Sequence, residues 1–198
     1  ALSIAQADKL TSEHLSAWTN SAKIQAIKTG VLSTLDAETQ LSGLNAAQIG
    51  YLTTTQIAAL TAGQVGDLTT EQVAALDHAE GHNQIAALKL DAVAALSKDQ
   101  VGSMNTDQIK ALSNKQVAAL DSDSFAALTN EQLAAIDSTD LAGVSNGRIN
   151  ALSADQFNAF SATQVTALTT SQVAALDDEI IAGLGQQEIQ ALTSAHIK

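Results

Sequence analysis

The sequence predicts an all-α solenoid, a superhelix of very short helices with one helix in each eight-residue repeat and about two repeats per coil. Three observations lead to this fold class: a large apolar residue returns every eight positions, a helix-capping residue follows it, and a glutamine stands three positions after the cap. A unit of eight residues is too small to bury a core alone. The units must therefore stack on one another.

The apolar residue at position 1 of this octad sets the register of the chain. Fourteen successive positions keep it without a slip: Leu88, Leu96, Met104, Leu112, Leu120, Leu128, Ile136, Val144, Leu152, Phe160, Leu168, Leu176, Leu184 and Leu192. Five earlier positions also keep the spacing of eight: Leu44, Leu52, Leu60, Leu68 and Leu76. Five more keep it apart from one extra residue before Ile27 and one before Leu44: Leu2, Leu10, Trp18, Ile27 and Leu35. We expect residues 1–198 to form one continuous array, and the unfinished last octad indicates part of a longer one.

Position 2 of the octad carries the residues that cap helix N-termini. They are Thr53, Thr61, Thr69, Asp77, Ser97, Asn105, Ser113, Asp121, Thr129, Asp137, Ser145, Ser153, Ser161, Thr169, Asp177 and Thr193. The glutamines at position 5 complete the Ser/Thr-x-x-Gln capping box: Gln56, Gln64, Gln72, Gln100, Gln108, Gln116, Gln132, Gln156, Gln164 and Gln172. His14 and His196 fall at the same position and are interpreted as substitutes for that glutamine. A new helix is therefore expected in every octad.

Other periodic structures fit the octad poorly. In one long helix, eight residues leave a drift of roughly 80°, so that the apolar stripe would wind around the helix within a few repeats. Strands require alternation of apolar and polar residues, which the apolar spacing of five and then three residues lacks. Short helices that turn a corner at each cap remain, and they are stable only when packed.

Positions 1, 6 and 8 are predicted to form the core. Position 6 is Val or Ile in most octads, position 8 is Ala or Gly, and the few aromatic residues follow the same rule, with Trp18 and Phe160 at position 1 and Phe125 and Phe157 at position 6. The small residue at position 8 indicates a close approach to the backbone, whereas the polar residues at position 7 indicate a half-exposed site. A stack of two-octad coils would form a rod on the order of 100 Å long.

The step from Leu76 to Leu88 is four residues longer than an octad, which predicts a loop insertion at residues 77–83. It contains the potential metal ligands Asp77, His78, Glu80 and His82, but Gly81 disfavours a helix that would bring the two histidines together. A solvated loop without metal is the simpler interpretation.

Three acidic corners are candidate calcium sites, because hard cations prefer carboxylate oxygens. They contain Asp121 and Asp123, Asp137 and Asp140, and Asp177, Asp178 and Glu179. Neither an EF-hand loop nor a glycine-rich nonapeptide is present, and each corner begins with an aspartate at the capping position. Helix capping explains the corners without an ion.

The sequence offers no candidate catalytic, cofactor-binding or metal-binding residue, and we expect no enzyme. It has no Cys and no phosphate-binding loop. The formal net charge of −12, with nine scattered Lys and Arg residues, disfavours nucleic acid and anionic membranes as partners. No apolar run reaches the roughly 20 residues of a membrane-spanning helix.

Residues 68–76 and 168–176 resemble a known repeat. They read Leu-Thr-Thr-Glu-Gln-Val-Ala-Ala-Leu and Leu-Thr-Thr-Ser-Gln-Val-Ala-Ala-Leu. These phrases are similar to the octapeptide-type Leu-Thr-x-x-Gln-(Val/Ile)-x-Ala repeats of large secreted or surface proteins of Gram-negative bacteria, often adhesin-like. The resemblance implies an extracellular or cell-surface location and a structural or adhesive role, and it transfers no functional residue. The DNA-binding transcription-activator-like effectors share a helix opening of this kind, but their longer repeat and basic surface are missing.

Three functional hypotheses follow. The first is a structural repeat segment, a spacer, stalk or adhesion scaffold of a bacterial surface or secreted protein, whose contacts are neighbouring repeats and another protein or a cell surface. The second is a solenoid that binds a protein or peptide through the 77–83 insertion and the variable positions 3, 4 and 7. The third is an ice- or surface-binding array based on Thr53, Thr61 and Thr69, which the later change of position 2 to Ser, Asp and Asn makes weaker.

Overall fold

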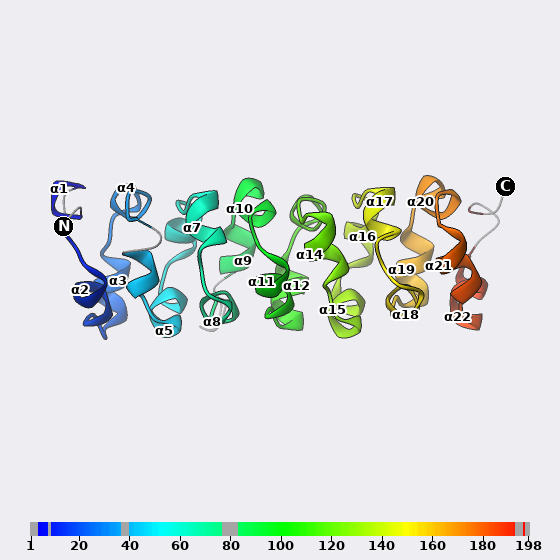
Figure 1. Cartoon of the computed structure of the whole chain (residues 1–198), viewed down its shortest axis with the longest axis horizontal. Coiled ribbons are helices and arrows are strands. Elements are labelled where there is room, and N and C mark those ends of the chain that lie inside the picture. The colour runs from blue at the N-terminus through cyan, green and yellow to red at the C-terminus, as the bar shows by residue number, and fades with distance from the viewer. Residues whose placement is uncertain (1–3, 8, 37–39, 77–82, 193–195, 197–198) are drawn as a thin grey trace. The chain divides into compact units, whose positions relative to one another are not determined.

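The structure is a computed structural model that describes residues 4–7, 9–36, 40–76, 83–192 and 196. The chain divides into two compact units, Ala1–Met104 and Asn105–Lys198. Throughout the described ranges the regular structure is helical, with α-helices of four to six residues (Figure 1). The predicted all-α solenoid of short helices is confirmed.

The first unit contains one 3-10 helix, η1, and eleven α-helices in its described part. Their bounds are α1 Ile4–Ala7, α2 Ser12–Ser16, α3 Ser21–Gln25, α4 Thr29–Leu32, η1 Leu41–Gly43, α5 Ala46–Gly50, α6 Thr54–Ile57, α7 Ala62–Gly66, α8 Thr70–Ala74, α9 Gln84–Ala87, α10 Leu90–Ala94 and α11 Lys98–Gly102.

The described part of the second unit has eleven α-helices, one in each octad. They are α12 Thr106–Ala111, α13 Asn114–Val117, α14 Ser122–Ala126, α15 Asn130–Ala135, α16 Ser138–Leu141, α17 Asn146–Ile149, α18 Ala154–Phe157, α19 Ala162–Ala167, α20 Thr170–Ala174, α21 Asp178–Gly183 and α22 Gln186–Ala191.

The predicted capping chemistry starts these helices. Thr69, for example, has an extended backbone (φ −71°, ψ 162°) and accepts a hydrogen bond from the Gln72 N–H, while the Gln72 side chain accepts one from the Thr69 N–H. All ten predicted Gln capping boxes are present. Because each box satisfies donors that a helix leaves free at its start, it defines where the helix begins.

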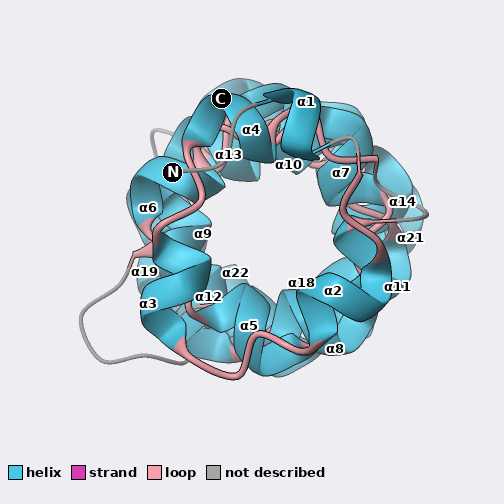
Figure 2. Cartoon of the chain, turned by 90° about the vertical axis from the view of Figure 1, so that its left-hand side faces the viewer, coloured by secondary structure: helices cyan, strands magenta, loops and turns pink. Residues whose placement is uncertain are grey.

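The number of octads per coil differs from the prediction. In the second unit, helices pack on the third helix before them, which gives three series: α12, α15, α18 and α21; α13, α16, α19 and α22; and α14, α17 and α20. In the first unit α10 likewise returns to α7, after the chain has passed through α8 and α9 on other sides of the ring (Figure 2). The expectation of about two repeats per coil is wrong.

The physical reason lies in the linkers. Two octads per coil would need a chain reversal at every cap, for which helices commonly use a left-handed residue. None of the described glycines has a left-handed φ, and the linker consists of extended residues such as Leu168 (φ −60°, ψ 143°) and Thr169 (φ −73°, ψ 155°). Such a linker changes the direction of the chain without reversing it, so more than three octads are needed to complete one coil of the solenoid.

Positions 1 and 6 form the core, as predicted. Leu60 and Val65 are buried, and Phe125, Phe157 and Phe160 are buried as well. Phe157 and Phe160 meet edge to face, with ring centroids 5.5 Å apart and an interplanar angle of 72°. The alanines at position 8 are mostly half-buried instead of fully buried, and the glutamines at position 5 complete the core.

Position 8 nevertheless lies close to another helix, as its small residues indicate. A Cβ added at Gly183 in α21 would collide with Ala154 Cβ in α18, whereas one at Gly102 would meet no atom within 4 Å.

We expect Gly183→Ala to lower the free energy of unfolding by about 1–3 kcal/mol, because two packed helices must separate. Gly102→Ala should be neutral or stabilising by up to about 1 kcal/mol, since Ala favours the helix. Urea unfolding of the two variants measures the difference, and equal effects would contradict the close approach.

Candidate functional site

The most distinctive polar feature of both units is a series of buried glutamine side chains, here called the glutamine ladder. It comprises Gln40, Gln48, Gln56, Gln64, Gln72, Gln84 and Gln100 in the first unit and Gln156, Gln164 and Gln172 in the second. All except Gln156, which is half-buried, are buried. All of them donate to backbone oxygens of an earlier coil, and all except Gln84 also accept a hydrogen bond from a backbone N–H close to them in the sequence.

Gln164 shows the arrangement. Its Oε1 accepts a hydrogen bond from the Ser161 N–H at 2.8 Å, which closes the capping box of α19. Its Nε2 donates to the backbone oxygens of Leu133 and Ile136, both at 2.8 Å, at the C-terminal end of α15. The same side chain therefore caps the start of its own helix and the end of a helix four octads earlier.

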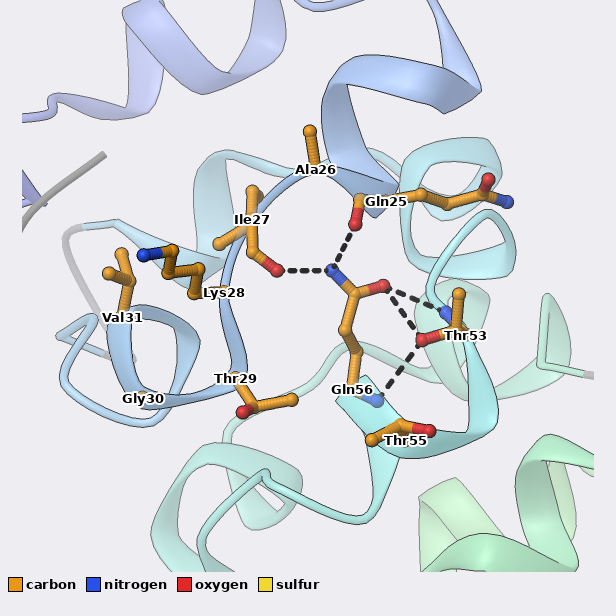
Figure 3. A pocket seen from close by; sticks show the side chains of 10 residues that line it. All are labelled: Gln25, Ala26, Ile27, Lys28, Thr29, Gly30, Val31, Thr53, Thr55 and Gln56. Carbon is orange, nitrogen blue, oxygen red and sulfur yellow. Dashed lines mark hydrogen bonds between the residues drawn. The ribbon is translucent and has the colours of Figure 1, made fainter. Parts of the chain in front are cut away.

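Gln56 makes the same contacts in the first unit (Figure 3). Its Oε1 accepts from the Thr53 N–H at 2.9 Å, and its Nε2 donates to Ile24 O at 2.9 Å and Ile27 O at 2.8 Å. It lies beside a cavity of about 680 Å³ that is also lined by Lys28, Thr29 and Thr55. Both the oxygen and the nitrogen of the Gln56 amide already have backbone partners, so this side chain does not need a ligand in the cavity to complete its hydrogen bonds.

The sequence separation between donor and acceptor in the ladder follows the octad repeat. Where no extra residue intervenes, a glutamine donates to oxygens 28 and 31 residues earlier, as Gln172 does to Val144 and Leu141. Across the insertion these separations become 32 and 35, as for Gln100 with Leu68 and Val65. The contact is therefore kept although four additional residues separate donor and acceptor.

Burial of an amide is favourable only when its polar atoms are bonded. Both hydrogens of Nε2 are used in Gln164, and the oxygens that they reach lie at the end of α15, where C=O groups lack the N–H donors of a continuing helix. Leu133 O also accepts from the Ile136 N–H at 3.2 Å. The ladder thus resolves one problem of very short helices, which is that most of their backbone groups are terminal.

Sequence reasoning identified these glutamines as caps but missed the contact between coils. A usable signal is present: Glu completes a capping box as well as Gln does, yet position 5 carries Gln repeatedly and Glu only at Glu80 and Glu188. A requirement for an amide donor explains this preference, because a carboxylate has no donor.

The two histidines at position 5 substitute for the ladder in part. His14 closes a capping box with Thr11, in which the Thr11 N–H donates to His14 Nδ1 at 3.1 Å. His196 Nε2 lies 2.9 Å from Leu168 O, which is the contact made by a ladder glutamine across 28 residues. The predicted replacement is confirmed for His14, and His196 reproduces the bond between coils.

A second set of contacts runs in the opposite direction along the chain, from position 7. Asn150 Nδ2 donates to Ala175 O at 2.6 Å, and Asn158 Nδ2 donates to Gly183 O at 2.7 Å, both 25 residues ahead. Both asparagines are half-buried, as predicted for position 7, but these contacts were not predicted.

Three acidic corners prove to be helix caps. Asp121 accepts from the Ser124 N–H at 2.7 Å, Asp137 from the Thr139 N–H at 2.9 Å, and Asp177 from the Ile180 N–H at 2.9 Å. Among the residues that the structure describes, no three Asp, Glu, His or Cys side chains form a group that could hold a metal ion. The ligands considered at Asp77, His78, Glu80 and His82 lie outside the described residues.

Four acidic groups at helix starts have shifted pKa values. The backbone N–H of Glu71 and the hydroxyls of Thr69 and Thr70 hold the pKa of Glu71 below its usual value, and its own N–H together with the Thr129 hydroxyl does the same for Glu131. The hydroxyl and N–H of Thr139 lower the pKa of Asp137. At Asp140, burial raises the pKa, the charge of Asp137 raises it further, and a bond from the Asn114 backbone opposes both.

We expect Asp140→Asn to stabilise the protein at neutral pH by less than about 1 kcal/mol. A raised pKa means that the folded state disfavours the carboxylate, so that this cost is present above the folded pKa and vanishes below the unfolded value near 3.8. Denaturant unfolding at pH 7 and pH 3 should show the gain only at pH 7.

Glu71→Gln is the matched comparison and should have the opposite sign. The lowered pKa of Glu71 stabilises the fold above its usual value of 4.5, and this contribution is lost as the pH falls through the folded value. The substitution should therefore destabilise at pH 7 and have no effect in acid. An Asp140→Asn gain that persists at pH 3 would contradict the assigned cause.

The chain is a helical repeat protein, in which each octad contributes one helix and its contacts to neighbouring coils. Comparison with known families agrees: the model of the ALTTAQ repeat matches residues 101–136 and 133–170. No curated protein matches the chain. Within the described ranges, no helix combines the length and apolar character needed to cross a membrane.

Proposed function

We propose that the chain is a structural segment, a spacer, stalk or adhesion scaffold, of a bacterial surface or secreted protein and has no catalytic activity. The observation that carries the proposal is the glutamine ladder, because the most distinctive polar residue of the octad is used in contacts between coils. Regular arrays place the same group at every step, whereas catalysis needs particular groups in one place. The match to a repeat family supports a structural role.

The proposed location rests on the resemblance of residues 68–76 and 168–176 to repeats of bacterial surface proteins. The acidic composition supports partners other than nucleic acid, since a net charge of −12 repels phosphate. Neighbouring repeats are the principal contacts in this proposal, and another protein or a cell surface is the external one.

A spacer must become longer when coils are added. Insertion of seven octads of the sequence of residues 161–168 after Leu168 adds about two coils, and the maximum dimension in small-angle X-ray scattering should rise by about 16–20 Å. The unmodified chain serves as the reference. A compact scattering profile, or a maximum dimension that stays constant, would contradict the spacer.

A peptide-binding scaffold is the second candidate, favoured by one apolar cavity. It has a volume of about 650 Å³ between α5 and α8 and is lined by Ala46, Ala47, Gly50, Tyr51 and Ala74, among others. Ala74→Trp would fill it. A binding scaffold should lose its ligand in this variant, whereas a spacer should keep both its length and its function.

Ice binding receives little support. The hydroxyl groups of Thr53, Thr61 and Thr69 accept hydrogen bonds from the backbone of their capping boxes, so each hydroxyl already has a partner in its own helix. Measurement of thermal hysteresis tests this hypothesis directly.

A further inference from the structure

Asn146 and Gly147 form the only Asn-Gly pair in the sequence, and they open α17. We propose that this pair is a site of spontaneous deamidation in the folded protein, and that the modification loosens α17 from α20. The inference rests on the chemistry of the pair, on the weak capping of this helix and on the contact that Asn146 makes with the next coil.

The reaction needs only water. The backbone nitrogen of Gly147 loses its proton to solvent and bonds to Asn146 Cγ, the bond from Cγ to Nδ2 breaks, and ammonia leaves. Water then opens the resulting succinimide at either carbonyl, which yields aspartate or isoaspartate. Glycine favours the ring closure because it has no Cβ to obstruct the approach of its nitrogen.

The surroundings of Gly147 allow this approach. The residue is exposed, and a Cβ built on it would meet no atom within 4 Å. Its N–H belongs to the first turn of α17, where no acceptor exists within the helix. The nitrogen is therefore accessible.

α17 is also poorly held at its start. The Ser145 side chain makes no capping bond, and position 5 is Arg148, which has only donors and cannot accept the Ser145 N–H. The Nε of Arg148 is buried without a hydrogen-bond partner. A four-residue helix without a capping box opens locally at low cost, and such opening allows the backbone geometry that ring closure requires.

The modified residue lies in a contact between coils. Asn146 Nδ2 donates to Ser171 O at 3.3 Å and contacts Ser171 Oγ at 3.2 Å, at the start of α20. Deamidation removes the donor. Isoaspartate also adds a carbon to the backbone, so that the bond from the Asn150 N–H to Asn146 O, 3.0 Å long, cannot keep its geometry.

Peptide mapping by mass spectrometry tests the site in the full chain, aged in mildly alkaline buffer at physiological temperature. Asn146 should convert on the order of tenfold faster than any of the other eight asparagines, because none of them precedes a glycine. The aged protein should have a lower melting temperature than fresh protein. Equal conversion at all asparagines would overturn the site, and an unchanged melting temperature after conversion would overturn its effect on the α17–α20 contact.

Gly147→Ala is the matched control. The space around Gly147 accepts a methyl group and alanine favours a helix, so the variant should fold normally while Asn146 stays intact and the melting temperature is kept during ageing. Conversion at the wild-type rate in this variant would overturn the mechanism. A parallel incubation in denaturant gives the rate without structure, and a native rate lower by a factor on the order of a hundred would show that the fold protects the pair, against the proposal.

Discussion

Gln164→Leu is expected to lower the free energy of unfolding by about 3–5 kcal/mol, although the two side chains have similar size. The variant leaves the Ser161 N–H and Ile136 O without the bonds that the amide supplies, and Leu133 O keeps only the bond from the Ile136 N–H. Each buried polar group without a partner costs about 1–3 kcal/mol. Denaturant unfolding followed by circular dichroism measures the loss.

Two further variants separate the ladder from other causes. Gln164→Glu keeps an acceptor for the capping box but loses both donors, so it should destabilise strongly at neutral pH and recover in acid, where a protonated carboxyl regains one donor. Gln187→Leu, at an exposed position of α22, should change stability by less than about 0.5 kcal/mol. If Gln164→Leu were as mild as Gln187→Leu, the ladder would have no stabilising role.

Deletion of residues 161–168, one complete octad, should preserve the helical spectrum of the protein, whereas deletion of residues 161–164 should abolish cooperative unfolding of the second unit. Deletion of a whole octad removes one helix of the solenoid, and every later residue then occupies an equivalent position of the repeat. Gln172 would then reach Leu133 and Ile136, the oxygens used by Gln164 in the intact chain. Half an octad would bring polar positions to the core.

Circular dichroism and thermal unfolding distinguish the two deletions. Loss of one octad removes one set of neighbour contacts and should lower the melting temperature modestly. The bonds of Gln100 are kept across the four additional residues between Leu76 and Leu88, whereas removal of four residues shifts every later octad by half a repeat. Equal stability of both deletion variants would disprove the octad register.

The sequence predicts the local structure of this protein well because each helix start depends on residues within four positions of one another. Thr69 and Gln72 define a capping box whatever the rest of the chain does. The number of octads per coil depends on the angle at each corner, which extended residues such as Leu168 and Thr169 determine together. No residue type signals that angle, so the size of the coil could not be obtained from the pattern.

Of the two roles of the ladder glutamines, the sequence predicts the helix cap but not the contact between coils. The capping role of Gln164 follows from its distance to Ser161, whereas its contact with Leu133 and Ile136 depends on the coil size that the pattern did not give. Asn150 and Asn158 were missed for the same reason, since their partners lie 25 residues away.

The bonds of the ladder all point the same way along the chain: a later glutamine donates and an earlier helix end accepts. During synthesis the acceptors of one coil therefore exist before their donors leave the ribosome. Each newly made octad can therefore form its glutamine bonds with a coil that has already been synthesised, whereas the bonds of Asn150 and Asn158 form only after a further 25 residues.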